Sequence, residues 1–160
     1  KPIRGNIDRR IGQMRAGSFD AIVLAVAGLS RLGCLDDITE IIPATDLIPA
    51  PAQGALALES RTGDAQAAAV ARLLDDPRSH LAALAERRVL AAIDPAEAMA
   101  FGMLVTVTDD VHAIADIARA DGSDRHVAEF RLPSSMGDWT EGLANRVIAE
   151  LSETGLIEAA

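Results

Sequence analysis

The chain has 160 residues, 49% of them hydrophobic, and a formal net charge of −9. This length and apolar content predict one or two small folded units with a buried core, and exclude a disordered tail. Only 2% of the residues are aromatic, so stacking platforms for single-stranded nucleic acid are not expected. Residues 62–160 hold the whole charge excess, because they carry eight Lys and Arg against seventeen Asp and Glu. A solvated acidic surface of this kind disfavours nucleic acid and anionic membranes as partners.

The single cysteine, Cys34, cannot form an internal disulfide, and no secretory leader or long apolar span is visible. We therefore expect a cytoplasmic protein that does not enter a membrane. The chain opens on Lys1 without an initiator Met, which leaves room for a preceding segment. The three histidines are not spaced to place two ligands on one face, so no metal site is predicted.

The first part of the chain predicts a short helix followed by a buried strand. Apolar residues at Ile7, Ile11 and Met14 have helical spacing over residues 7–15, with Asn6 placed to cap the helix. The continuous apolar run over residues 21–27 is typical of a strand that is covered on both faces in a parallel sheet. Together these elements would form half of a βαβ unit, whose opening strand is expected before Lys1.

The next segments predict one helical turn, a loop and a second strand. Residues 29–32 have the pattern of the turn, and residues 42–51 contain three prolines, which favours a loop or linker. The pattern of residues 55–59 predicts the second strand.

Residues 62–160 predict a small α+β domain. Asp64 is placed to cap a helix that runs through residue 74, and a longer helix is expected over residues 79–93, ended by Pro95. Three β-rich segments separated by turn residues predict a three-stranded antiparallel meander: residues 101–107, 111–119 and 127–132.

The C-terminal stretch predicts an amphipathic helix. Trp139, Leu143, Val147 and Leu151 recur every four residues, and Gly155 follows as a stop signal. The fold class expected for the whole chain is therefore mixed, half of a βαβ-type domain followed by a three-stranded antiparallel sheet with helices.

Three stretches of the sequence resemble consecutive signatures of the porphobilinogen deaminase (hydroxymethylbilane synthase) family. They are Arg-Gly-Asn-Ile-Asp-Arg-Arg at residues 4–10, Phe-Asp-Ala-Ile-Val-Leu-Ala-Val-Ala-Gly-Leu-Ser-Arg-Leu-Gly at residues 19–33, and Ile-Pro-Ala-Pro-Ala-Gln-Gly-Ala-Leu-Ala-Leu-Glu at residues 48–59. The resemblance implies a role in tetrapyrrole (porphyrin, heme) biosynthesis. Family members are roughly twice this long, and their N-terminal domain with its catalytic aspartate has no counterpart here, so no catalytic residue is expected in this chain.

The resemblance also implies a division into two domains. Residues 1–61 would be the second half of the central substrate-binding domain, together with the strand that returns to the N-terminal domain. Residues 62–160 would be the C-terminal α+β domain.

The family joins four porphobilinogen units with release of ammonia, on a dipyrromethane cofactor tethered to a cysteine. By the resemblance, Arg4, Arg10 and Arg31 would bind the acetate and propionate groups of the pyrrole chain. Arginine suits this task because its planar fork binds a carboxylate with two hydrogen bonds and stays charged. From their spacing alone, three solvated surface arginines are the simpler interpretation.

Several positions depart from the family pattern. When Glu86-Arg87 is matched to the family's Glu-Arg pair, Glu97 falls where the cofactor cysteine should be. A thiolate forms a stable thioether, whereas a carboxylate would give at best a labile ester, so dipyrromethane is not expected to be attached. By the resemblance, Cys34 would lie in a different domain from the attachment position, and it is expected to be a buried or half-buried thiol. Ala52 replaces a common glycine, and Arg9 adds a charge of unassigned purpose.

Two function classes follow from these observations. The first is a portion of hydroxymethylbilane synthase that is inactive alone and takes a pyrrole as its small-molecule substrate. The alternative is a non-catalytic remnant, or a module that binds pyrrole carboxylates or a partner protein. In either case, we expect self-association through the incomplete domain, or pairing with a missing N-terminal segment.

Overall fold

The computed structural model describes residues 1–93, 99–135 and 138–157, and its packing divides the chain into two compact units. The first unit is Lys1–Pro43 and the second is Ala44–Ala160. The packing groups residues 44–61 with the second unit, and the domain boundary predicted after residue 61 stays a prediction.

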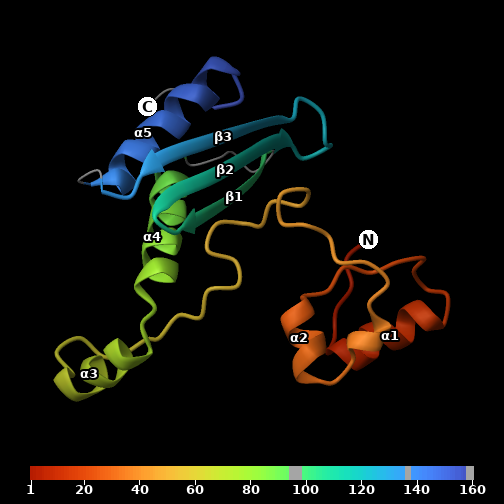
Figure 1. The fold of residues 1–160 in the computed structure, drawn as a ribbon. Helices are drawn as coiled ribbons and strands as arrows, with labels where there is room; N and C mark the ends of the chain where they lie inside the picture. Colours follow the sequence, from red (N-terminus) through yellow and green to blue (C-terminus); the bar gives the residue numbers. More distant parts are fainter. Residues whose placement is uncertain (94–98, 136–137, 158–160) are drawn as a thin grey trace. The chain divides into compact units, whose positions relative to one another are not determined.

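The first unit contains helices α1 (Ile7–Arg15) and α2 (Val26–Arg31) and the 3₁₀ turn η1 (Leu35–Asp37) (Figure 1). The helix predicted over residues 7–15 is confirmed, and the side chain of Asn6 caps it by accepting a hydrogen bond from the Arg9 amide at 3.1 Å. Helices α1 and α2 approach closely, because a Cβ atom at Gly28 would lie 2.8 Å from Cδ1 of Ile7.

The strand predicted over residues 21–27 is wrong. Residues 21–25 belong to no sheet, and α2 begins at Val26, inside the predicted strand. The apolar run indicates a tendency to be buried, but a strand forms only where a neighbour completes its backbone hydrogen bonds. The described residues offer this run no such neighbour, and Val23 has an exposed fraction of 67%.

The second unit begins with helices α3 (Ala65–Leu74) and α4 (Pro77–Ile93). Asp64 caps α3 as predicted, with its side chain accepting from the Ala67 amide at 3.0 Å. Helix α4 starts two residues earlier than predicted, because proline fits the first helical position and Asp76 accepts from the Ser79 amide at 2.8 Å. Pro95, the predicted stop of this helix, lies outside the described residues.

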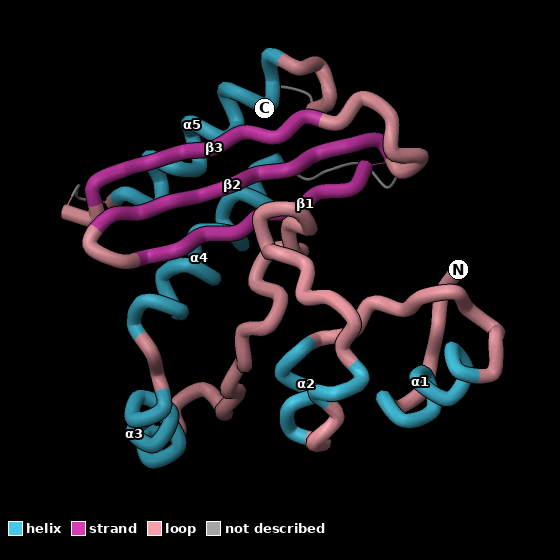
Figure 2. Tube along the Cα trace, turned by 45° about the vertical axis from the view of Figure 1, so that its right-hand side comes forward, coloured by secondary structure: helices cyan, strands magenta, loops and turns pink. Residues whose placement is uncertain are grey.

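The predicted three-stranded antiparallel meander is confirmed, with strands β1 (Met99–Val107), β2 (Asp110–Arg119) and β3 (His126–Pro133). The order is β1-β2-β3, so β2 is the central strand, as Figure 2 shows. The additional strand predicted over residues 55–59 is wrong. Those residues pair with no described strand, and the side chain of Leu56 has an exposed fraction of 89%.

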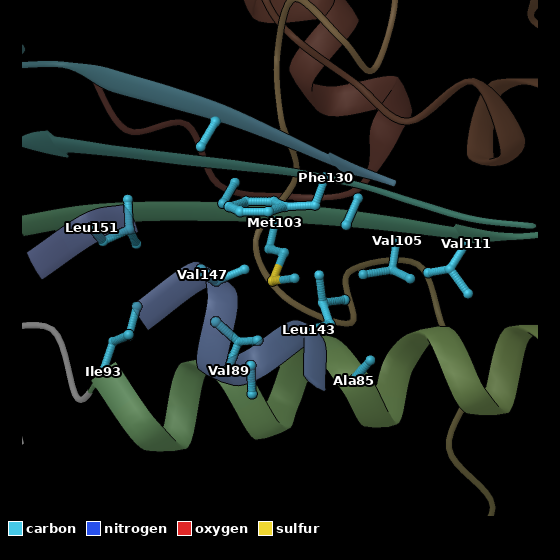
Figure 3. Packing of buried hydrophobic residues seen from close by; sticks show 14 of the residues in the cluster. Ala85, Val89, Ile93, Met103, Val105, Val111, Phe130, Leu143, Val147 and Leu151 are labelled. Atoms are coloured by element: carbon cyan, nitrogen blue, oxygen red, sulfur yellow. The ribbon is translucent and has the colours of Figure 1, made fainter. Parts of the chain in front are cut away.

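Helix α4 and helix α5 (Trp139–Glu153) cover one face of the sheet and enclose the core (Figures 1 and 3). The predicted repeat every four residues is confirmed, because Trp139, Leu143, Val147 and Leu151 are all buried. Met103 points from β1 toward the two helices (Figure 3). Alternate residues of each strand face these helices, as expected for a sheet with one covered face.

Replacement of a core leucine should have a far larger effect than replacement of an exposed one. Leu143 is fully buried between α5 and the sheet, whereas Leu73 on α3 is 84% exposed. We expect Leu143→Ala to lower the free energy of unfolding by about 3–5 kcal/mol, because it removes buried methyl groups and leaves a cavity. Leu73→Ala should change it by less than about 0.5 kcal/mol. Urea unfolding followed by circular dichroism measures both, and similar losses in the two variants would contradict this core.

Candidate functional site

The guanidinium group of Arg10 is anchored at the start of α1. Arg10 is half-buried, and its Nε donates a hydrogen bond to the carbonyl oxygen of Gly5 at 2.7 Å. This bond restricts the side chain and leaves the two terminal amino groups of the fork without a hydrogen-bond partner among the described residues. A guanidinium group held in this way can bind a carboxylate through two parallel hydrogen bonds.

Gly5 is needed for this geometry. Its φ angle is 122°, a conformation that residues with a side chain rarely adopt. A Cβ atom at this position would also lie 2.9 Å from Cδ of Arg9. The exposed side chain of Arg9 therefore packs against the same glycine whose carbonyl holds Arg10.

Arg4 and Arg31 are both exposed, the first just before α1 and the second in the last turn of α2. Within residues 1–93, 99–135 and 138–157, neither they nor Arg10 form an ion pair, whereas Arg15 pairs with Asp37. The structure places all three predicted arginines in the first unit, on the two helices that meet at Gly28 or next to them. That their guanidinium groups converge on one ligand stays a prediction.

Glu86 is a buried acidic side chain whose hydrogen bonds the sequence does not predict. Its side chain on α4 is buried, and its carboxylate accepts hydrogen bonds from the amides of Ala52, at 2.5 Å, and Val105, at 2.7 Å. Burial raises the pKa of Glu86, and the two amide hydrogen bonds oppose that rise. The sequence offers one signal, a charged residue on the same helix face as the buried Ala85 and Val89.

The described part of the chain has no group of three His, Cys, Asp or Glu side chains that could hold a metal ion. None of its helices is long and apolar enough to cross a membrane.

Residues 1–69 match the family model described as porphobilinogen deaminase, dipyrromethane cofactor binding domain. Porphobilinogen deaminase 1 of Streptomyces avermitilis is 42% identical over 154 residues, which cover 96% of this chain and 42% of that relative. The porphobilinogen deaminase of Mycobacterium ulcerans is 38% identical over 172 aligned positions, covering 99% of this chain and 52% of the relative. Over nearly its whole length, the chain is therefore similar to part of a porphobilinogen deaminase.

The match extends over only part of the family's length. The chain spans about half the length of the curated porphobilinogen deaminases it matches, 42% of one and 52% of another. The porphobilinogen deaminase of Mycobacterium tuberculosis H37Rv is 44% identical over 111 residues, 69% of this chain and 36% of the relative. Residues 1–69, which match the family's cofactor-binding domain, include Arg4, Arg10 and Arg31.

A dipyrromethane would need cations for its carboxylates and a thiolate for its covalent tether. Three arginines without an ion-pair partner among the described residues are the right donors for acetate and propionate groups. The only cysteine, Cys34, is half-buried, with its Sγ 3.5 Å from the carbonyl oxygen of Leu32. Glu97, the residue at the expected attachment position, lies outside the described residues.

Proposed function

We propose that this chain is the pyrrole-binding part of a porphobilinogen deaminase. In that role it takes part in the stepwise polymerisation of porphobilinogen to hydroxymethylbilane, with release of ammonia, in the cytoplasm. The observation that carries the proposal is the match of residues 1–69 to the family's dipyrromethane cofactor binding domain, because this region contains Arg4, Arg10 and Arg31.

The residues of this chain would bind and orient the growing pyrrole chain. A bound dipyrromethane supplies the primer to which further pyrrole units are added. Arg10, already restrained by Gly5, would fix one carboxylate, and Arg4 and Arg31 would bind others. No residue of the chain is assigned to the bond-forming step, so we expect turnover of porphobilinogen by the chain alone to stay at background.

The expected affinity is low. Hydrogen bonds to charged groups contribute about 1.5 kcal/mol each, so three arginine contacts supply about 4–5 kcal/mol. This corresponds to a dissociation constant of about 1 mM. Exposed charge pairs are screened by salt, so the affinity should fall as the ionic strength rises.

Titration with a linear polycarboxylated pyrrole, followed by NMR, tests the proposal. Arg10→Ala and Arg31→Ala should each weaken binding several-fold, up to about tenfold, because each removes one charged contact. Arg72→Ala is the matched control, because it removes the same charge from an exposed arginine on α3 and should leave the affinity unchanged. The proposal fails if millimolar ligand shifts no resonance of Arg4, Arg10 or Arg31.

Exposed apolar side chains favour a second candidate function, a non-catalytic module that binds a partner protein or a second copy of itself. The side chains of Leu56, Leu73 and Leu74 are 89%, 84% and 69% exposed. Burial of these apolar side chains against a partner would be favourable. Sedimentation over a range of protein concentrations tests self-association. A module of this kind would associate without any response to the pyrrole ligand, whereas the leading proposal requires that response.

A further inference from the structure

Strand β1 has one edge paired with β2 and one edge without a strand partner among the described residues. Two amides on this open edge are nevertheless satisfied. The Met103 amide donates to the carbonyl oxygen of Pro49 at 2.8 Å, and the Val105 amide donates to Oε1 of Glu86 at 2.7 Å. Residues 48–52 and the carboxylate of Glu86 therefore occupy the place that a fourth strand would take.

The carboxylate of Glu86 also holds the segment that lies along this edge. Its second oxygen, Oε2, accepts from the Ala52 amide at 2.5 Å. Glu86 lies on α4, which packs against one face of the sheet. Its side chain therefore links this helix by hydrogen bonds to the edge strand β1 and to residues 48–52. Only 6% of the residue is exposed, so water cannot replace these hydrogen bonds freely.

Residues 48–52 lie in close contact with strand β1. A Cβ atom at Gly102 would lie 2.9 Å from the carbonyl oxygen of Ile48, so this strand position must be glycine for the segment to approach. Ile48 itself is buried, with an exposed fraction of 9%. The segment ends in a turn that Gln53 closes, because its Oε1 accepts from the Ala50 amide at 3.0 Å.

We propose that Glu86 is a latch, in the sense that its carboxylate holds residues 48–52 on the open edge of β1 and thereby keeps this segment packed with the sheet. Without its carboxylate, one backbone hydrogen bond, from Met103 to Pro49, is left to hold the segment to the strand. Residues 44–61 would then be released from the sheet unit. The latch does not depend on pyrrole binding, because it involves none of the three arginines.

The charges around Glu86 determine how the latch responds to pH. Residues 48–53 and β1 contain no ionisable side chain. On α4, the neighbouring Arg87 and Arg88 are exposed, and Arg88 pairs with Asp138 at the start of α5, 3.2 Å away. No cation therefore neutralises Glu86 within the described residues, and two amides alone stabilise its charge.

The sign of the pH effect follows from linkage. Burial raises the pKa of Glu86 in the closed latch above its value in the open chain, about 4.3 for an exposed glutamate. The closed state therefore binds the proton more tightly, and its stability falls as the pH rises from about 4.3 to the raised pKa. Above that raised pKa the contribution is constant. Glu86→Gln cannot ionise, so it should remove this part of the pH dependence of unfolding.

NMR of the full chain tests the latch in the unmodified protein. The amide proton shifts of Ala52 and Val105 should titrate with one common midpoint above the usual glutamate pKa, because both amides donate to the same carboxylate. Glu86→Gln should abolish this titration. It should also speed hydrogen exchange at one of the two amides by at least about tenfold, because an amide side chain has only one acceptor oxygen.

Glu153→Gln, at an exposed glutamate in α5, is the matched control and should change neither the titration nor the exchange rates. Two amides that titrate separately, or not at all, in the unmodified protein would overturn the proposal. That result would decide the question even if the Glu86→Gln variant failed to fold. Unchanged exchange at both amides in a folded Glu86→Gln variant would overturn it equally.

Discussion

The purified chain should have the intact mass of its bare sequence, 16.8 kDa, with no covalently attached dipyrromethane. A stable thioether needs a thiolate, and the second unit contains no cysteine in its sequence. Glu97 stands at the expected attachment position, and a carboxylate is a weaker nucleophile whose ester would hydrolyse. Cys34 lies in the first unit and is half-buried, which disfavours it as a substitute.

Intact-mass spectrometry after incubation with porphobilinogen measures this outcome. Cys34→Ala is the control, because an adduct lost in this variant would identify Cys34 as an unexpected tether, and one that persists would point to another residue. A mass excess of one dipyrromethane in the unmodified chain, or turnover of porphobilinogen without a second protein, would contradict the prediction.

Local signals in the sequence predicted most helices and all three strands of the sheet. The cap residues Asn6 and Asp64 have the hydrogen bonds expected of them, because capping involves amides only two or three residues away. The repeat every four residues in α5 is also a local signal. It reports one buried helix face, and the structure shows that face on the sheet (Figure 3).

The predictions that were wrong concern features that depend on distant parts of the chain. The runs at residues 21–27 and 55–59 are apolar enough for strands, but pairing requires a partner that periodicity cannot identify. The role of Glu86 was missed for the same reason, because its two amide donors lie 34 and 19 residues away in sequence. The three arginines could be selected only through the family resemblance, since spacing alone does not distinguish them from solvated surface residues.

Hydrogen exchange should show two parts of the chain with very different protection. In the first unit, all of whose residues are described, Ile11 and Leu29 are the only buried hydrophobic residues. The second unit has a continuous core that includes Met103, Ile117 and Leu143. Segments of about 40 residues usually need a disulfide, a metal or a partner to stay folded, and two buried side chains cannot offset the entropy lost on ordering such a segment.

We therefore expect the amides of α1 and α2 to exchange at least about a hundredfold faster than those of β2 and α5, because local opening costs less where few apolar contacts are broken. Mass-resolved exchange at several protein concentrations measures the difference. Protection of α1 that rises with concentration would identify self-association as the stabilising event. Protection that rises with a polycarboxylated pyrrole would show that ligand binding and ordering of the arginine-bearing unit are coupled, since a ligand stabilises the state it binds. Equal and strong protection of both units in a ligand-free monomer would contradict the prediction.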